Sequence, residues 1–451
     1  MFTFTKIISA IIAFVMMMLP MDKQPEEQKC APEFTGTFIQ SWMTCSWDDE
    51  RWAEEAENMK KAGIEYLVLQ SLADKAYKKD GGQWKVYYKT DVATLKDATY
   101  GGDCLEPALK ACQDAGIKVF VGLSMFDDFW NEAGIGALYQ DVCRVAGDMM
   151  EDIYNKYGEK YKDSLYGWYY TPEISNGFLC QFTLGGIIKG INHIIDRIYE
   201  VDASKPLLMS PFYSEYIATG PIATLCSYVR FFDKVNFRDG DIVAPQDAVG
   251  AKWTREKSLE MTWKLYKAAF DTCDADIKLW ANCENFDGAI SSEILGGVLS
   301  PKITEHTSNV TATLDRFVRQ MDVASKYAEN IITSSYYHYY SPSNVNPAFI
   351  NTYYDYLENG YKIETQAPET PENIKKTQTE KGIEISWDEA DDNIGIAYYR
   401  IEKDGKFLAR IDKYYGWEEN LCTDEKADLN SIYTIEAVDA AGNSTGKIEI
   451  K

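Results

Sequence analysis

The chain has 451 residues, of which 45% are hydrophobic and 26% are charged. These are ordinary proportions for a folded globular protein, and they exclude an intrinsically disordered chain and a polytopic membrane protein. A formal net charge of −24 would repel nucleic acid and anionic lipid, and no basic cluster with interleaved aromatics offsets it. We therefore expect neutral ligands and no nucleic-acid partner.

The N-terminal segment has the pattern of an export signal. Lys6 precedes an apolar run, Ile7 to Leu19, which is shorter than the ~20 residues needed to span a bilayer. We therefore predict that residues 1–30 are a signal peptide or membrane anchor with its leader, and that the protein is secreted or held at the cell surface. Because no small-residue cleavage site is clear, both alternatives stay open.

From Phe34 onward, strand-like runs alternate with helical segments. The predicted strands are Phe34–Gln40, Ile64–Gln70, Ile117–Gly122, Ser164–Tyr170, Pro206–Ser210, Asp241–Pro245, Ile277–Asn282 and Ile331–Tyr336. The predicted helices are Asp49–Lys61, Leu105–Ala115, Leu138–Tyr157, Ile187–Val201, Ile222–Lys234, Thr254–Asp271, Thr311–Asn330 and Pro347–Asn359.

Eight such units predict a (β/α)₈ TIM barrel over residues 31–363. A doubly wound open sheet is the alternative, and it is weakened by Gln40-Ser41-Trp42, which stands where that fold has a glycine-rich phosphate turn.

The composition changes after Ile363. Pro368 and Pro371 predict an extended linker at residues 364–372. Short alternating runs separated by turns then predict an all-β sandwich over residues 373–451. Pro371, Ile385-Ser386-Trp387, Tyr399-Arg400-Ile401 and the run from Tyr433 to Asp439 resemble the fibronectin type III domain. That resemblance implies a module of the kind appended to secreted bacterial enzymes that act on carbohydrates.

Two glutamates follow predicted strands in an aromatic context. Glu173 follows the fourth strand and Glu284 the seventh. A carboxylic acid that leaves the carboxyl end of a barrel strand lies where such barrels carry their chemistry. Two carboxyl groups of different pKa are what glycoside hydrolysis requires, and this makes a glycoside hydrolase the leading hypothesis.

Further residues at predicted strand ends or in loops are candidates for contact with a sugar. Aromatic rings pack on the apolar faces of sugars, and amides and carboxylates bind hydroxyl groups. For each aromatic ring, ordinary barrel packing is an equally good interpretation. The candidates are Gln40, Trp42, Trp130, Tyr170, Tyr213, Gln246, Asp247, Trp280, Asn282 and His338, with Phe286 and Tyr337 as further stacking aromatics.

Metal and cofactor sites are not predicted. The ten cysteines contain no Cys-x-x-Cys pair, and three histidines from unrelated segments do not make a metal site. We expect several cysteines to be buried thiols, and any disulfide connectivity stays open.

The barrel segment is itself familiar. Gly36 to Gln40, Met59 to Ile64, Ile242 to Gly250 and Leu279 to Glu284 resemble an uncharacterised family of bacterial barrel proteins regarded as glycoside hydrolases. The two glutamates are placed as in the large retaining clan of (β/α)₈ glycosidases. That similarity implies an acid/base role for the first glutamate and a nucleophile role for the second. The clan usually has Asn before the acid/base, whereas Pro172 stands there in this chain.

The sequence therefore predicts a secreted glycoside hydrolase that acts on an oligosaccharide or polysaccharide with Glu173 and Glu284 and without a cofactor. A non-catalytic glycan-binding or adhesion protein at the cell surface is the competing hypothesis. A weaker third hypothesis is a barrel hydrolase that pairs Asp247 with one of the glutamates.

Overall fold

The computed structural model describes residues 2–19, 28–76, 82–126, 136–176, 184–215, 220–288, 308–426 and 430–450. The chain divides into two compact units, each described here by itself. The barrel unit consists of residues 1–249, 253–284 and 320–334, and the C-terminal unit of residues 250–252, 285–319 and 335–451.

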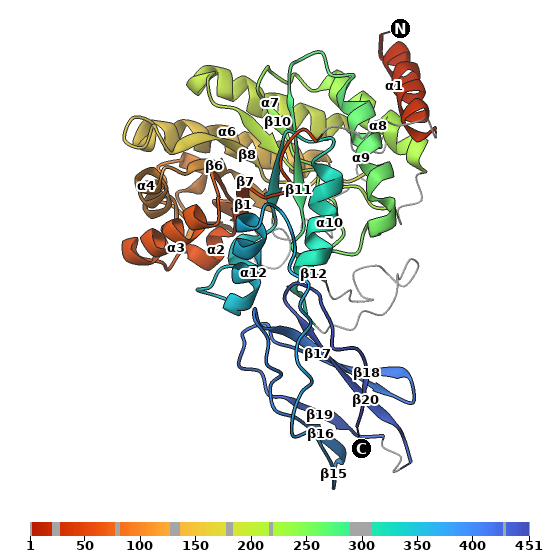
Figure 1. The fold of residues 1–451 in the computed structure, drawn as a ribbon. Coiled ribbons are helices and arrows are strands. Elements are labelled where there is room, and N and C mark those ends of the chain that lie inside the picture. Colours follow the sequence, from red (N-terminus) through yellow and green to blue (C-terminus); the bar gives the residue numbers. More distant parts are fainter. Residues whose placement is uncertain are drawn as a thin grey trace. The chain divides into compact units, whose positions relative to one another are not determined.

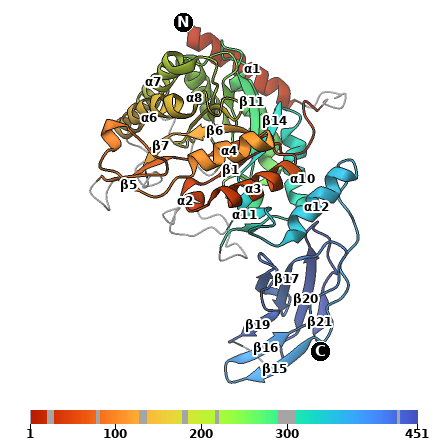
Figure 2. The ribbon, with the colours of Figure 1, turned by 90° about the vertical axis from the view of Figure 1, so that its left-hand side faces the viewer.

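Eight parallel strands form a closed barrel, with the order β1-β14-β11-β10-β9-β8-β6-β2 around it (Figures 1 and 2). The sequence therefore predicted the barrel, its strand number and its strand order correctly. The strands are β1 (Gly36–Ile39), β2 (Tyr66–Leu69), β6 (Lys118–Gly122), β8 (Leu165–Tyr170), β9 (Leu207–Met209), β10 (Ile242–Val243), β11 (Lys278–Cys283) and β14 (Asn330–Thr333).

The helices of the barrel unit include α1 (Phe2–Met18), α2 (Ser41–Thr44), α3 (Asp49–Lys61), α4 (Leu105–Ala115), α6 (Gly136–Tyr157), α7 (Leu184–Asp202), α8 (Pro221–Lys234) and α9 (Leu259–Phe270), with short 3₁₀ turns at Ala93–Leu95 and Glu256–Ser258. Six of them, α3, α4 and α6 to α9, correspond to predicted segments, although α9 begins at Leu259 and not at Thr254; α2 was not predicted. The apolar helix α1 lies beside α8 and α9, where Lys6 pairs with Asp233 and Asp274. Within the described ranges, no helix is long and apolar enough to cross a membrane.

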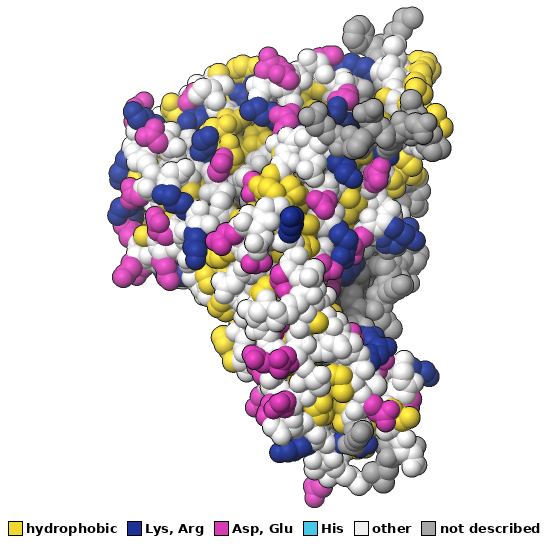
Figure 3. All heavy atoms as spheres, in the orientation of Figure 1, with side chains coloured by type: hydrophobic (Ala, Val, Ile, Leu, Met, Phe, Trp, Pro, Cys, Tyr) yellow, Lys and Arg dark blue, Asp and Glu magenta, His cyan; other side chains and the backbone are white. Residues whose placement is uncertain are grey.

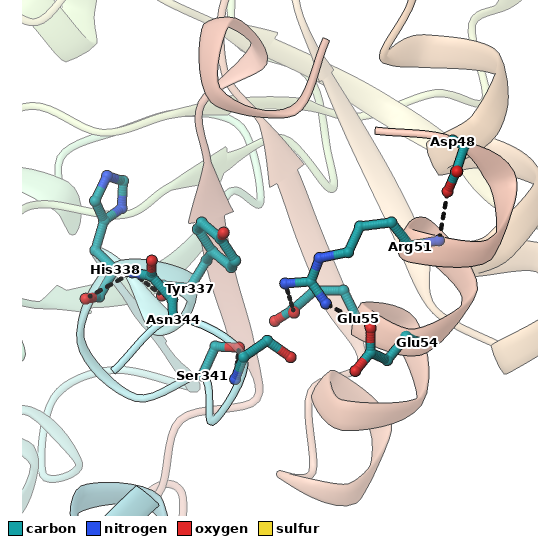
Figure 4. A network of polar contacts seen from close by, with 9 residues as sticks. Asp48, Arg51, Glu54, Glu55, Tyr337, His338, Ser341 and Asn344 are labelled. Atoms are coloured by element: carbon teal, nitrogen blue, oxygen red, sulfur yellow. Dashed lines mark hydrogen bonds and ion pairs between the residues drawn. The ribbon is translucent and has the colours of Figure 1, made fainter. Parts of the chain in front are cut away.

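Local signals set the bounds of α3. The Asp48 side chain accepts a hydrogen bond from the backbone N–H of Arg51 and caps the helix, and Gly63 follows the helix with φ of +81°. Arg51 then donates to Glu54 and Glu55 one turn further along (Figure 4).

Apolar side chains fill the interior of the barrel, and every strand contributes to this core. Its members are Phe38, Val68, Phe120, Tyr169, Leu208, Ile242, Ala244, Trp280 and Ile332. Side chains alternate between the two faces of a strand, so the residue two positions further along also faces the interior. The polar residues that follow these core positions therefore meet at the carboxyl end of the barrel.

A second sheet in the barrel unit was not predicted. Its order is β5-β4-β3-β7, from Thr99–Tyr100, Trp84–Val86, Ala73–Lys75 and Ser124–Phe126. These strands have only two or three residues each, which is too short for a period-two pattern to be recognised. The segments that follow β2 and β6 are therefore structured extensions of the barrel.

The C-terminal unit contains two antiparallel sheets that share one hydrophobic core. One sheet has the order β15-β16-β19 (Lys375–Thr379, Gly382–Ser386, Leu421–Asp424), and the other has β18-β17-β20-β21 (Lys406–Asp412, Ile396–Lys403, Tyr433–Asp439, Ile448–Ile450). The strands β15 and β19 were not predicted, because β15 is mostly exposed and β19 has only four residues. The unit also contains α11 (Tyr336–Tyr339), α12 (Pro347–Glu358) and the pair β12 (Phe286–Asp287) and β13 (Val310–Thr311).

Two predicted bounds near the end of the barrel were wrong. Helix α10 runs from Leu314 to Ala324, and so it is shorter than the predicted Thr311–Asn330. Thr311 belongs to β13, where it pairs with Phe286 of β12, and so it is not part of the helix. The last barrel strand ends at Thr333 and Tyr336 begins α11, whose first turn is capped by the Ser335 side chain.

Candidate active site

Polar side chains lie directly above the barrel core, at the carboxyl ends of the strands. Isolated parallel bridges join Ser175 to Phe212, Phe212 to Gln246, and Gln246 to Asn282, so the fourth to seventh strands stay in register beyond their last regular residues. Four of the predicted site residues belong to this region: Glu173, Gln246, Asn282 and Glu284. The structure thus places them on neighbouring strands of one barrel end.

Glu173 lies three residues beyond the end of β8 and is half-buried. Its carboxylate accepts a hydrogen bond of 3.3 Å from the side-chain amide of Gln246, and Tyr169 of the barrel core is its neighbour. Burial raises the pKa of Glu173 to about 7, although the Gln246 hydrogen bond opposes this shift. The shift does not require the charge of Glu284. A carboxyl group with this pKa can act as a general acid near neutral pH.

Gln246 is held in place by the strands on either side of it. Its backbone N–H donates to Pro211 O at 2.8 Å, and its side-chain Nε2 also lies 3.2 Å from Ser210 O. These contacts point the amide toward Glu173. The predicted role of Gln246 in binding a hydroxyl group is compatible with this position.

Asn282 faces the barrel interior two residues above Trp280. Its Nδ2 donates to Ser210 Oγ at 3.1 Å, and Ser210 in turn donates to Ala244 O at 2.8 Å. Asn282 Oδ1 is buried and has no hydrogen-bond partner among the described residues, and the same holds for Gln40 Oε1 at the end of β1. A buried acceptor without a partner is costly unless a ligand or water donates to it. Both amides are therefore suited to bind hydroxyl groups.

Glu284 directly follows β11 and is only 4% exposed. Its backbone is fixed on both sides: the N–H donates to Asp247 Oδ1 at 3.3 Å, and the carbonyl accepts from Gln320 Nε2 at 3.0 Å. The residue is thus held in a fixed backbone position at the end of the seventh strand.

Asp247 does not face the mouth of the barrel. It is completely buried, and its carboxylate accepts from Gln320 Nε2 at 2.5 Å and from the Val249 N–H at 3.2 Å, in addition to the Glu284 N–H. The Cys283 thiol, which alternates with the inward-facing residues of β11, is another neighbour. The prediction that Asp247 contacts substrate is therefore wrong, because its carboxylate binds the protein instead. The same finding removes the hypothesis of Asp247 as a catalytic carboxylate.

Gln320 was not predicted as a site residue. It lies on α10, is completely buried, and connects Asp247 with the Glu284 carbonyl. In the sequence it occupies a helical position among Phe317, Met321 and Ala324, all of which are buried. A polar residue on the apolar face of a helix is a signal that could have been used, since buried amides need partners.

Three aromatic residues that were predicted to contact a sugar are instead packed against protein. Trp280 lies in the barrel core, with its ring 4.9 Å from that of Tyr66. Tyr170 is 1% exposed and lies beside the Cys143 thiol of α6, and Tyr213 is 3% exposed and lies near Tyr228 and Tyr266 of the outer helices. Because these rings are covered by protein, they offer no face to a sugar. Trp42 on α2 is 57% exposed and stays a candidate, while Trp130 lies outside the described residues.

His338 belongs to the C-terminal unit. Its Nδ1 lies 2.6 Å from Ser335 Oγ, and burial lowers the pKa of the imidazole to about 4. Its carbonyl oxygen accepts from the Asn344 side chain at 3.4 Å, and the same amide donates to Tyr337 O at 3.1 Å (Figure 4). The imidazole is therefore neutral at physiological pH, so it can exchange hydrogen bonds but not supply a positive charge.

The described side chains do not form a metal site. In the part of the chain that the structure describes, no three His, Cys, Asp or Glu side chains are grouped to hold a metal ion. The nine described cysteines are all thiols, and five of them are buried, as expected for a chain without a cysteine scaffold.

Comparison with known proteins supports the fold. The model of one family, described as "Domain of unknown function (DUF4434)", matches residues 34–346. No curated protein matches the chain.

Among solved structures, a candidate alpha-L-fucosidase from Bacteroides thetaiotaomicron is 18% identical, with a TM-score of 0.57 over 76% of this chain and 100% of that chain. A glycoside hydrolase family 5 protein from Bacteroides vulgatus is 14% identical, with a TM-score of 0.42 over 91% of this chain and 90% of that chain. At 18% identity, the similarity to the Bacteroides thetaiotaomicron structure shows a shared fold.

Proposed function

The chain belongs to the family described as "Domain of unknown function (DUF4434)", and we propose that the barrel of this member is a glycoside hydrolase. One observation carries the proposal. Glu173 is a half-buried carboxyl group at the carboxyl end of the fourth strand, with a pKa of about 7, and the buried Glu284 follows the seventh strand of the same barrel. A pair of carboxyl groups in different protonation states is what this reaction needs.

In the proposed mechanism Glu173 is the general acid. Its proton passes to the oxygen of the glycosidic bond as that bond breaks, so the leaving group departs as a neutral alcohol. Glu284 acts as a carboxylate that attacks the anomeric carbon and forms a glycosyl-enzyme. Water then attacks the same carbon, Glu173 accepts the proton of that water, and Glu284 is released. The anomeric configuration is retained, because two displacements occur at one carbon.

The remaining residues of the mouth would bind the sugar. Gln246 holds Glu173, and the partnerless acceptors of Asn282 and Gln40 are suited to hydroxyl donors. Among the described residues, the side chains that line the site beside the two glutamates are amides, which favours a neutral sugar over an acidic one. We further propose that the C-terminal sheets are a fibronectin type III-like module and that the protein is exported.

Substrate screening with matched variants tests the proposal. Nitrophenyl glycosides of neutral sugars, with the α-L-fucoside among the first because of the Bacteroides thetaiotaomicron structure, would be assayed with wild type, Glu173→Gln and Glu284→Gln. We expect each substitution to lower kcat/KM by about 10³-fold or more, since each removes one chemical role. Glu329→Gln is the control, because Glu329 is exposed at the opposite end of the barrel, where β14 begins.

The two roles can also be separated. A dinitrophenyl leaving group departs without protonation, so Glu173→Gln should retain far more activity on dinitrophenyl glycosides than on alkyl glycosides. Glu284→Gln should lose activity on both. Equal activity of the variants and wild type would exclude these two glutamates as the catalytic pair. No turnover of any substrate by wild type would favour the glycan-binding hypothesis.

A further inference from the structure

We propose that the C-terminal unit carries a binding platform for the chain of a neutral glycan. The platform consists of Trp417 and Tyr415, which are 76% and 43% exposed. Their rings stack with centroids 4.8 Å apart and an angle of 9° between their planes. Because the rings stack on each other, Tyr415 backs one face of Trp417, and the largely exposed Trp417 offers its other face. A flat apolar face of this kind matches the C–H face of a sugar ring. The platform itself is defined by the unit's own residues, and its role as a substrate site rests on the proposed function.

The loop that carries the platform is held in one conformation. The Glu418 carboxylate accepts from the backbone N–H groups of Tyr415 at 2.7 Å and Gly416 at 2.9 Å. Gly416 has φ of +90°, a conformation that other residues rarely adopt. The buried Lys413 amine donates to Glu418 O at 2.6 Å and Asn420 Oδ1 at 3.2 Å. A rigid aromatic site loses little entropy on binding.

The platform continues into a series of aromatic rings within the same unit. Tyr414 packs edge-on against Tyr415 at 4.7 Å and against Tyr339 at 6.4 Å, and Tyr339 stacks on Phe286 at 5.2 Å. Tyr414 also donates from its hydroxyl to His338 O. Tyr415 is thus supported by rings of the C-terminal unit itself.

The negative charge of this loop and of the whole chain excludes some of the ligands that could pack on an aromatic face. Glu418 and Glu419 lie in the same loop, and the whole chain has a formal net charge of −24. Lys413 is 2% exposed and is already paired, so it offers no cation to a ligand. An anionic glycan, a nucleic acid or an anionic membrane would be repelled. A neutral polysaccharide combines flat apolar faces with the absence of charge, and it is the occupant that fits.

Affinity electrophoresis tests the platform. The full chain carrying Glu284→Gln, which keeps the polymer intact, would be run through gels that contain soluble xylan, mannan, β-glucan or dextran, with polygalacturonate as the charged comparison. We expect retardation by at least one neutral polymer. Trp417→Ala should weaken that binding about tenfold, and Tyr415→Ala should weaken it less. Phe407→Ala is the matched control, since Phe407 is a 40% exposed aromatic of the same unit outside the platform.

Three results would overturn the proposal. The first is that no neutral polymer retards the protein, and the second is that the parent and Trp417→Ala are retarded equally. The third is that Trp417→Ala changes the oligomeric state without changing retardation, which would make a second copy of the chain the occupant. Retardation does not depend on turnover. An inactive barrel with an intact platform, or the reverse, would therefore be recognised as such.

Discussion

Glu173 is the residue whose surroundings have the clearest chemical consequence. Burial raises its pKa to about 7, so the carboxyl is protonated below that pH and ionised above it. As a general acid it is active only when protonated, and we expect kcat/KM to fall as the pH rises through about 7. A pH profile of wild type measures this basic limb. If the limb is unchanged in Glu173→Gln with its residual activity, another group titrates there.

The same shift predicts a pH dependence of stability. The folded state binds the Glu173 proton more tightly than the unfolded chain, whose carboxyl has the ordinary pKa of 4.5. This contribution is fully present at acidic pH and is lost as the pH rises through about 7. Relative to wild type, Glu173→Gln should therefore gain up to about 3 kcal/mol of unfolding free energy on going from about pH 4 to about pH 9. Urea unfolding of both proteins at the two pH values measures it, and a pH-independent difference would contradict the shift.

Gln320 is the residue whose removal should affect catalysis without a contact to substrate. Gln320→Leu breaks the hydrogen bonds to Asp247 and to the Glu284 carbonyl, so the Glu284 backbone loses one of the two hydrogen bonds that fix it. We expect kcat to fall about tenfold or more with little change in KM, and a loss of about 1–3 kcal/mol of stability. Thr262→Val is the control, because it removes a buried hydrogen bond of α9, from Thr262 Oγ1 to Ser258 O. Equal kinetic effects of the two variants would reduce Gln320 to a structural role.

At the scale of elements, a buried ion pair fixes the start of β10. Asp241 is completely buried and accepts from Arg238 and from the backbone N–H of Leu207 at 2.8 Å. Asp241→Ala leaves Arg238 buried without its partner and should destabilise the fold by about 3–5 kcal/mol, as measured by urea unfolding. Asp271→Ala, which breaks the largely exposed pair with Lys267 on α9, should cost less than about 1 kcal/mol. A similar loss from both variants would contradict a special role for the β10 pair.

For the molecule as a whole, charge is the property with a direct functional consequence. Acidic and basic side chains are interspersed over the face seen in Figure 3, yet acidic residues outnumber basic ones by 70 to 46. Turnover of neutral glycans should therefore be nearly independent of salt between about 0.01 and 1 M, whereas binding of a polyanionic glycan should be weak and improve with salt. Kinetics over a salt series check this. Strong salt inhibition on neutral substrates would point to an electrostatic contribution that the site geometry does not provide.

The sequence by itself determined the barrel. Its eight predicted strands are runs of five to seven residues rich in apolar side chains, and Gly63, Gly116 and Gly240 directly precede three of them; these are local signals. The positions of Glu173 and Glu284 follow from the strand count alone, because parallel strands in a barrel all end at one face. The roles of both residues stay predictions.

Only the tertiary structure decided which way the strand-end residues face. Gln246 and Asp247 are adjacent in sequence, yet the first contacts Glu173 and the second lies behind the barrel wall with Gln320. Alternation sends neighbours to opposite faces, and so Tyr169 lies in the barrel core while Tyr170 lies beside the Cys143 thiol of α6. The bulge near the start of β8 shifts the phase of that strand, which the sequence did not reveal. The pKa of Glu173 and the Gln320 contact likewise depend on elements more than 70 residues away, so no local pattern could determine them.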